Sequence, residues 1–126
     1  MTAHPVPLVL VVESDPVQRD LIQMTLTRIG CEVINTRDPQ QVVPLFTKYH
    51  PSLLILDTFI PGSSGLELLN ELQELKVIKH SLVLFVSSYG FPEIIQQAKE
   101  AGVNEFIMKP INSSDFGQRV KKLLKI

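Results

Sequence analysis

Residues 53 to 57 read Leu-Leu-Ile-Leu-Asp, and the chain then turns through Thr-Phe-Ile-Pro-Gly-Ser-Ser-Gly over residues 58 to 65. A continuous apolar run of this length, bounded by turn residues, predicts a strand that is buried on both faces of a sheet. The run ends on Asp57, which would project from the carboxyl end of that strand. Ligands of open α/β sheets bind at that end, so Asp57 is the first candidate for a chemically active residue.

The chain has 126 residues, which is the size of one ordinary domain, and we expect a single domain over residues 1–126. Twelve Lys plus Arg against 13 Asp plus Glu give a net charge of −1. That balance argues against direct nucleic-acid binding and against an anionic membrane surface. The single cysteine, Cys31, excludes an internal disulfide and a multi-cysteine metal site, and we expect it to be buried as a small apolar residue.

The amino terminus reads Met-Thr-Ala-His-Pro-Val-Pro and does not resemble a signal peptide, because it lacks a basic region followed by an apolar core. No apolar run approaches the ~20 residues that a membrane span needs. We therefore expect a soluble, cytoplasmic protein without a membrane partner. His4, His50 and His80 are scattered, with no second ligand at a suitable spacing, so we expect them to be solvated and predict no zinc site.

Short apolar runs alternate with segments of helical period, which predicts a parallel sheet with helices on both faces. The expected strands are Leu8 to Val12, Glu32 to Thr36, Leu53 to Asp57, Leu82 to Val86 and Val103 to Met108. The expected helices lie near 16–29, 39–48, 65–75, 92–101 and 114–125. These elements fit a doubly wound, flavodoxin-like α/β fold with strand order 2-1-3-4-5, although periodicity alone leaves that order open.

Capping residues mark several expected helix starts. Asp15 and Asp38 each precede a proline suited to the first helical position, and Ser64 with Glu67 fits a capping box. Pro44 falls inside the second expected helix, where its missing N–H and its ring cost about 3 kcal/mol or more. We therefore expect that helix to be kinked, short or irregular.

In this strand order, four strands deliver polar residues to one edge of the sheet. These residues are Glu13, Ser14 and Asp15 after the first strand, Asp57 after the third, Ser87 and Ser88 after the fourth, and Lys109 after the fifth.

Several separated stretches resemble the receiver domain of two-component response regulators, which has the CheY-like fold. The similarity runs from about Val9 to Leu124. Residues 11–16, Val-Val-Glu-Ser-Asp-Pro, resemble the acidic turn of the family, and Leu-Asp at 56–57 with Pro-Gly at 61–62 and glycine at 65 resembles its phosphoacceptor segment. Val-Ser-Ser at 86–88 resembles the hydroxyl-bearing end of its fourth strand, and Ala-Gly-Val-Asn-Glu-Phe-Ile-Met-Lys-Pro at 101–110 resembles its stretch from the fourth helix to the Lys-Pro turn.

The resemblance implies that Asp57 accepts a phosphoryl group from a phosphohistidine on a sensor histidine kinase or a phosphotransfer protein. A carboxylate nucleophile needs partners that neutralise the charge of the phosphoryl oxygens. Lys109 would supply an ammonium group and Ser87 a hydroxyl donor. Mg²⁺ would be held by Glu13, Asp57 and the backbone carbonyl of Phe59.

The same resemblance implies a switch and a tuned lifetime. Ser87, drawn toward the phosphoryl group, would vacate space that Phe106 can enter, and this movement would repack a surface read by a downstream protein effector or by a missing output domain. Phe59 and Tyr89 match positions that border the phosphoryl group and influence its hydrolysis. Two bulky aromatic side chains there predict a screened, slowly hydrolysing phosphoryl group.

Glu13-Ser14 departs from the family pattern, in which two adjacent acids help to hold Mg²⁺. A neutral hydroxyl at Ser14 gives up one full charge, so we expect weakened Mg²⁺ binding, by at least about 10 to 100-fold. Glu13 is longer than aspartate and could reach inward. Asp15 could substitute as a ligand, but its position before Pro16 favours a role as helix cap.

Ser14 also supports an alternative function, a pseudo-receiver that is never phosphorylated and acts as a protein-interaction module. Other classes fit less well. The turn after the first strand lacks the phosphate loop of a flavodoxin and the G-x-G-x-x-G of a dinucleotide site. Phe59 stands where the haloacid-dehalogenase phosphatases need a second aspartate. We therefore expect no enzymatic activity beyond the phosphorylation and dephosphorylation of Asp57.

Overall fold

A computed structural model describes residues 6–126 and shows a five-stranded parallel sheet with the order β2-β1-β3-β6-β7. The strands of this sheet are β1 (Leu8–Val12), β2 (Glu32–Thr36), β3 (Leu53–Asp57), β6 (Leu82–Ser87) and β7 (Glu105–Met108). This is the expected order, so the doubly wound, flavodoxin-like fold is confirmed. A separate two-stranded hairpin, β4 (Phe59–Ile60) with β5 (Ser63–Ser64), follows β3 directly.

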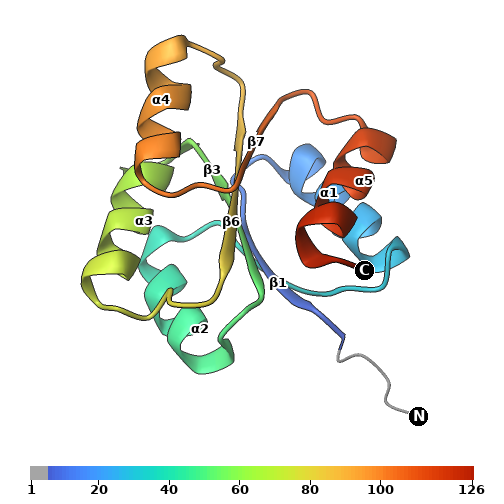
Figure 1. Cartoon of the computed structure of the whole chain (residues 1–126), viewed down its shortest axis with the longest axis horizontal. Coiled ribbons are helices and arrows are strands. Elements are labelled where there is room, and N and C mark those ends of the chain that lie inside the picture. The colour runs from blue at the N-terminus through green and yellow to red at the C-terminus, as the bar shows by residue number, and fades with distance from the viewer. Residues whose placement is uncertain (1–5) are drawn as a thin grey trace.

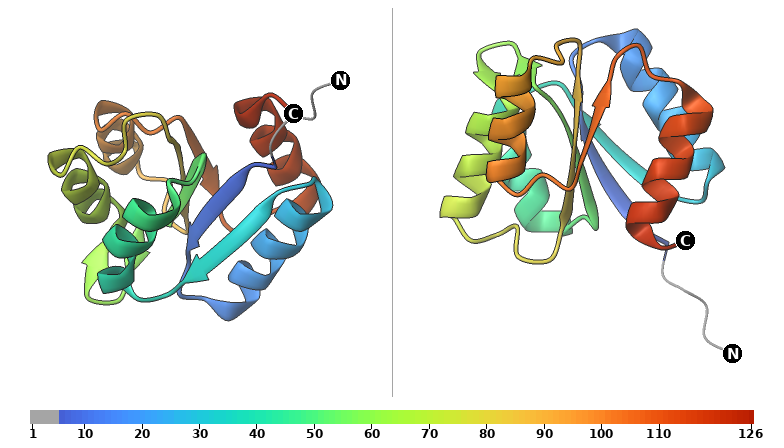
Figure 2. Two further views of the ribbon diagram at one scale, coloured as in Figure 1. Left: turned by 90° about the horizontal axis from the view of Figure 1, so that it is seen from below. Right: turned by 45° about the horizontal axis from the view of Figure 1, so that its top comes forward.

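Helices cover both faces of the sheet (Figure 1). They are α1 (Pro16–Arg28), the 3-10 turn η1 (Pro39–Gln41), α2 (Val42–Tyr49), α3 (Gly65–Glu74), α4 (Pro92–Glu100) and α5 (Ser113–Leu124). Figures 1 and 2 show α1 and α5 on one face and α2, α3 and α4 on the other. Because neighbouring strands of this sheet all pair in parallel, their carboxyl ends lie at the same edge.

The apolar core lies in two layers, one on each side of the sheet. All five residues of β3 are buried, as a strand covered on both faces requires. Val11 and Ile55 point into the layer beneath α1 and α5, where Phe116 is fully buried. Leu54 and Phe85 point into the opposite layer beneath α2, α3 and α4. The buried strand that ends on Asp57 thus anchors both layers.

The strand that was expected from Val103 begins two residues later, at Glu105. Asn104 is the reason, because its side-chain oxygen accepts a hydrogen bond from Val83 N at 2.8 Å and its own N–H bonds to the Val83 carbonyl at 2.8 Å. A side chain therefore takes the place of a ladder bond at this point. At the other end of the pair, β6 extends one residue further than expected, to Ser87.

The helix that contains Pro44 is short and irregular, as expected, but the proline does not lie in its interior. The segment splits into η1 and the eight-residue α2, and Pro44 is the third residue of α2. At that position the missing N–H would have had no partner within the helix, so the proline is tolerated.

The expected caps are present. Asp15 accepts a hydrogen bond from Val17 N at 3.0 Å, Asp38 from Gln40 N at 2.9 Å, and Ser64 from Glu67 N at 3.1 Å. Cys31 is buried in the core, and this burial raises the pKa of its thiol.

The histidines were expected to be solvated, and His50 and His80 are exposed, whereas His4 lies outside the described residues. Within residues 6–126, every helix is too short or too polar to cross a membrane.

Candidate functional site

Three charged side chains from different strands meet at the carboxyl edge of the sheet. Glu13 follows β1, Asp57 ends β3 and Lys109 follows β7. The Lys109 Nζ lies 2.5 Å from Glu13 Oε1 and 2.6 Å from Asp57 Oδ2. The ammonium group therefore joins two carboxylates that are 44 residues apart in the chain, counted from Glu13 to Asp57.

The group is largely closed to solvent. The Glu13 side chain is fully buried, and the side chains of Asp57 and Lys109 are 9% and 10% exposed. Backbone donors serve the two remaining carboxylate oxygens, since Asp15 N donates to Glu13 Oε2 at 3.2 Å and Phe59 N donates to Asp57 Oδ1 at 3.1 Å. Each of the four carboxylate oxygens thus has a partner within the chain.

Burial and neighbouring charged groups shift the pKa values of Glu13 and Lys109. Burial, followed by the neighbouring Asp57, raises the pKa of Glu13 to about 7, and the ammonium of Lys109 opposes that rise. Burial alone would lower the pKa of Lys109, but the carboxylates of Asp57 and Glu13 raise it above its ordinary value. Lys109 therefore stays positively charged beside Asp57.

A glycine allows α3 to begin against this site. A Cβ atom at Gly65 would lie 2.6 Å from the backbone oxygen of Asp57 and 3.3 Å from the ring of Phe85. Gly65 N also donates to the Thr58 carbonyl at 3.0 Å. Any larger residue here would push on the strand end that carries Asp57.

Ser87 ends β6 and is fully buried. Its hydroxyl donates to the Tyr89 carbonyl at 2.9 Å and accepts from Tyr89 N at 3.0 Å. The Ser87 carbonyl accepts from Lys109 N at 2.7 Å. Ser87 is therefore hydrogen-bonded both to Lys109, which follows β7, and to Tyr89 in the loop after β6.

Three exposed aromatic side chains border the site, and we call Phe59, Tyr89 and Phe91 the aromatic row. The ring centroids of Phe59 and Tyr89 are 5.1 Å apart and meet edge to face, and those of Tyr89 and Phe91 are 6.0 Å apart and stacked. Phe59 and Tyr89 were predicted from the sequence to border the site, whereas Phe91 was not. The sequence feature that could have identified Phe91 is its place directly before Pro92 at the start of a helix. A polar capping residue is usual at that position, and Phe91 is large and apolar.

Phe106 lies on β7, opposite Phe85 of β6, and packs partly buried against the core layer beneath α4. A hollow of about 330 Å³ adjoins it, between α4 and β7, with Ile95 and Met108 among its lining residues. Phe106 therefore lines a hollow between α4 and β7 that the described residues leave unfilled.

A cation at this edge would find oxygen ligands only. The anionic ligands among the described residues here are the carboxylates of Glu13 and Asp57, and the half-buried Ser14 follows Glu13 in the chain. Asp15 is exposed and caps α1, as its position before Pro16 favoured. Among the described residues, no three His, Cys, Asp or Glu side chains gather into a metal site.

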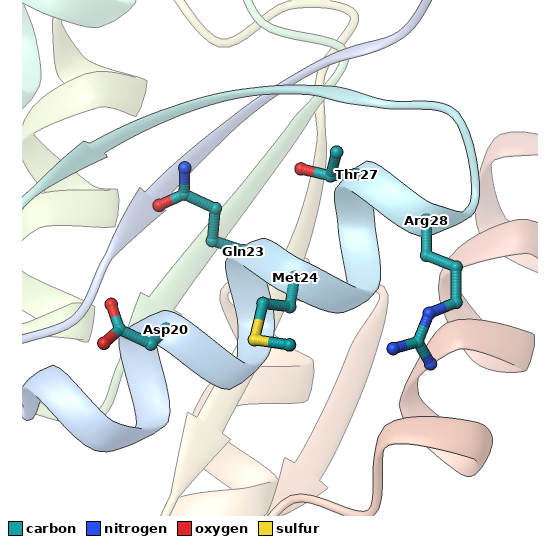
Figure 3. A pocket seen from close by; sticks show the side chains of 5 residues that line it. All are labelled: Asp20, Gln23, Met24, Thr27 and Arg28. Atoms are coloured by element: carbon teal, nitrogen blue, oxygen red, sulfur yellow. The ribbon is translucent and has the colours of Figure 1, made fainter.

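A larger hollow, of about 600 Å³, lies away from this edge on the outer surface of α1 (Figure 3). Its lining side chains are Asp20, Gln23, Met24, Thr27 and Arg28, and all come from that one helix. A concavity lined by one helix face brings no groups together from different elements. Cavity size therefore does not point to the chemistry of this molecule, whereas the convergence of Glu13, Asp57 and Lys109 does.

A family model described as the response regulator receiver domain matches residues 9–121. The chain belongs to the response regulator receiver family. Among curated proteins, the sporulation initiation phosphotransferase F of Bacillus subtilis is 29% identical over 119 residues, which is 94% of either chain. The polar-differentiation response regulator DivK of Brucella ovis is 27% identical over 116 residues, covering 92% of this chain and 94% of DivK.

Solved structures of other receivers share the fold. A response regulator from Thermotoga maritima superimposes with a TM-score of 0.86 at 24% identity, over 97% of this chain and all of that one. The Vibrio cholerae chemotaxis protein CheY4 superimposes with a TM-score of 0.87 at 22% identity, over 94% of this chain and 99% of that one. The CheY-like resemblance seen in the sequence is thereby confirmed, and the chain is a receiver domain of the two-component type.

Proposed function

We propose that this receiver is a phosphorelay component that takes a phosphoryl group from a phosphohistidine onto Asp57 and then presents an altered surface to a protein effector. The observation that carries the proposal is the contact of Lys109 Nζ with Asp57 Oδ2 at 2.6 Å, at the edge where parallel strands end. The donor would be a sensor histidine kinase or a phosphotransfer protein. The proposal keeps the cytoplasmic location expected from the sequence.

The transfer is a displacement at phosphorus. A carboxylate oxygen of Asp57 forms the new O–P bond, the P–N bond of the donor breaks, and the electron pair leaves with the imidazole. Lys109 is placed to balance the charge of the transferred group. Such chemistry needs a phosphodonor and no further catalytic residue, so we propose no enzymatic activity beyond the gain and loss of this phosphoryl group.

Mg²⁺ fits the proposed site by donor type, because Glu13, Asp57, the Phe59 carbonyl and Ser14 offer only oxygen ligands. When bound there, the ion would neutralise charge on the phosphoryl oxygens. Its binding is weakened in this proposal, because Ser14 carries no charge and Glu13 is already in contact with Lys109.

The switch in this proposal begins at Ser87. To donate a hydrogen bond to a phosphoryl oxygen, its hydroxyl must give up the bond to the Tyr89 carbonyl. The freed space and the hollow beside Phe106 then favour a different packing of β7 against α4. The altered surface would be the one that an effector reads.

Incubating the metal-loaded protein with phosphoramidate tests the proposal. We expect an intact-mass increase of one phosphoryl group that is stable in acid and labile in base. The Asp57→Ala variant should not gain it. A gain that persists in Asp57→Ala would contradict the assignment of the acceptor.

The alternative is a pseudo-receiver that serves as a protein-interaction module without phosphorylation. Ser14 and the internal pairing of all four carboxylate oxygens favour it. The same incubation decides between the two, because the pseudo-receiver predicts no adduct at high Mg²⁺ and none with a phosphorylated donor protein.

A further inference from the structure

A hollow of about 450 Å³ lies at the carboxyl end of β2, the outer strand of the sheet. Its lining side chains come from α1, from the end of β2 and from the turn and η1 that follow, and they are those of Arg19, Asn35, Thr36, Arg37, Asp38 and Gln41. Small-ligand sites usually have volumes of about 300 to 1,000 Å³. Unlike the hollow on α1, this one brings polar side chains together from different elements.

Two guanidinium groups line this hollow without an acidic partner. Among residues 6–126, no carboxylate lies within 4.0 Å of a side-chain nitrogen of Arg19 or Arg37. A guanidinium group has five N–H donors. Arg19 uses one of them, from Nη1 to the Glu13 carbonyl at 3.4 Å, and the exposed Arg37 side chain donates to no other described residue. Two like charges in one hollow repel each other unless an anion lies between them.

Hydrogen bonds within the turn after β2 fix the other lining groups. Thr36 is buried, and its hydroxyl accepts from Asp38 N at 3.1 Å and donates to Gln41 Oε1 at 3.1 Å. The Gln41 amide nitrogen therefore remains as a neutral donor. Asp38 also lines the hollow, but its carboxylate accepts from Gln40 N at 2.9 Å and caps η1. The hollow thus offers two cations and one neutral donor on a braced turn.

We propose that this hollow binds the phosphate group of a small molecule, with Arg19 and Arg37 contacting the phosphoryl oxygens and the Gln41 amide donating to a further oxygen. A phosphate monoester carries a charge of about −1.5 to −2 at pH 7, which matches two guanidinium groups better than the single charge of a carboxylate does. The planar fork of a guanidinium group also binds phosphate oxygens in pairs. Binding here needs neither Mg²⁺ nor phosphorylation of Asp57, so it goes beyond the proposed function and does not rest on it.

Arg37→Gln is the deciding variant, because Arg37 is exposed and its side chain forms no bond within the described fold. Arg19→Gln removes the second cation, but it also removes the bond to the Glu13 carbonyl. Arg28→Gln is the matched control, since it deletes the same charge from the last turn of α1 and Arg28 does not line this hollow.

The test is a titration of the metal-free, isotope-labelled protein followed by NMR. The probes are AMP, phenyl phosphate and inorganic phosphate, with adenosine and phenol as controls that lack the phosphate group. We expect the phosphate probes to shift the Nε–H signals of Arg19 and Arg37 and the side-chain amide of Gln41, with saturation at millimolar concentration. Arg37→Gln should weaken this binding at least about tenfold, and Arg28→Gln should stay within about twofold of the parent.

Tighter binding of an ester than of inorganic phosphate would identify an ester as the ligand, and equal binding would show that the free ion is sufficient. Both results support a phosphate site. Absence of saturable binding by all three phosphate probes would overturn the inference, as would equal binding to the parent and to Arg37→Gln. Binding of adenosine or phenol as tight as that of their phosphates would also overturn it, because the phosphate group would then contribute nothing. An equal loss in Arg28→Gln would contradict a site at this hollow, since the response would then follow net charge alone.

Discussion

At the scale of single residues, the unusual feature is Glu13-Ser14 at the turn after β1. Glu13 does reach inward, as its length suggested, but it contacts Lys109 at 2.5 Å. The sequence could indicate that four strands deliver polar groups to one edge. It could not indicate how three of them would pair, because side-chain pairing depends on distances that only the folded sheet sets.

Ser14→Asp would return a second acid to the turn beside Glu13. We expect Mg²⁺ to bind at least about 10-fold more tightly, because a hard cation gains an anionic oxygen ligand. Calorimetric titration of the parent and the variant with Mg²⁺ measures this directly. Ser63→Asp, which adds the same charge on the β4–β5 hairpin, is the control. An unchanged Mg²⁺ affinity in Ser14→Asp would show that the missing charge at residue 14 is not the cause of weak Mg²⁺ binding.

The raised pKa of Glu13 predicts how stability depends on pH in the metal-free protein. The folded-state pKa is about 7 against an ordinary value of 4.5, so the folded state binds more protons between these values. Protonated Glu13 therefore contributes to the free energy of unfolding at acid pH. This contribution is lost as the pH rises from about 4.5 to 7, and the loss is at most about 3 kcal/mol. Glu13→Gln should lack this loss in urea unfolding across that range, and parallel curves for parent and variant would contradict it.

Phe59 and Tyr89 are exposed and in contact with each other beside Asp57, which suits a screen between a phosphoryl group and water. We expect Phe59→Asn and Tyr89→Ala each to shorten the lifetime of phosphorylated protein several-fold. The decay of the adduct after removal of excess phosphoramidate is the measurement. A phosphoryl group that is lost faster from the parent than from either variant would refute the screening role.

At the scale of elements, local chemistry explains which boundaries the sequence predicted. The caps at Asp15, Asp38 and Ser64 depend on neighbours within a few residues, and all three were predicted. The later start of β7 depends on Asn104 bonding to Val83 across the sheet, 21 residues away in the chain. The β4–β5 hairpin was missed because Phe59 to Ser64 also has the composition of a simple turn.

The element that should move on phosphorylation is the end of β6 with the loop into α4. Ser87→Ala removes the hydroxyl that bonds to Tyr89 and is proposed to follow the phosphoryl group. We expect this variant to be phosphorylated by phosphoramidate but to show reduced chemical-shift changes across α4 and β7 in amide NMR spectra. Ser88→Ala, an exposed neighbour, serves as the control. Full shift changes in Ser87→Ala would exclude Ser87 as the first step of the switch.

At the scale of the whole molecule, two core layers hold one sheet so that its carboxyl edge carries all the candidate chemistry. The alternation of apolar runs and helical segments predicted this fold, and the fully buried strand Leu53–Asp57 predicted where the site begins. The aromatic row extends that edge outward with Phe91, which pattern analysis did not associate with the site. Phe91 comes near Phe59 only because the crossovers bring the ends of β3 and β6 together. A short stretch of sequence does not show which distant residues will become neighbours in this way.

The central claim is that Asp57 accepts the phosphoryl group, and the most direct measurement locates that group within the chain. After incubation with Mg²⁺ and phosphoramidate, borohydride reduces an aspartyl phosphate to homoserine, and peptide mass spectrometry identifies the modified residue. We predict homoserine at position 57 and at no other aspartate. An unmodified Asp57, or homoserine at Asp15 in its place, would contradict the account.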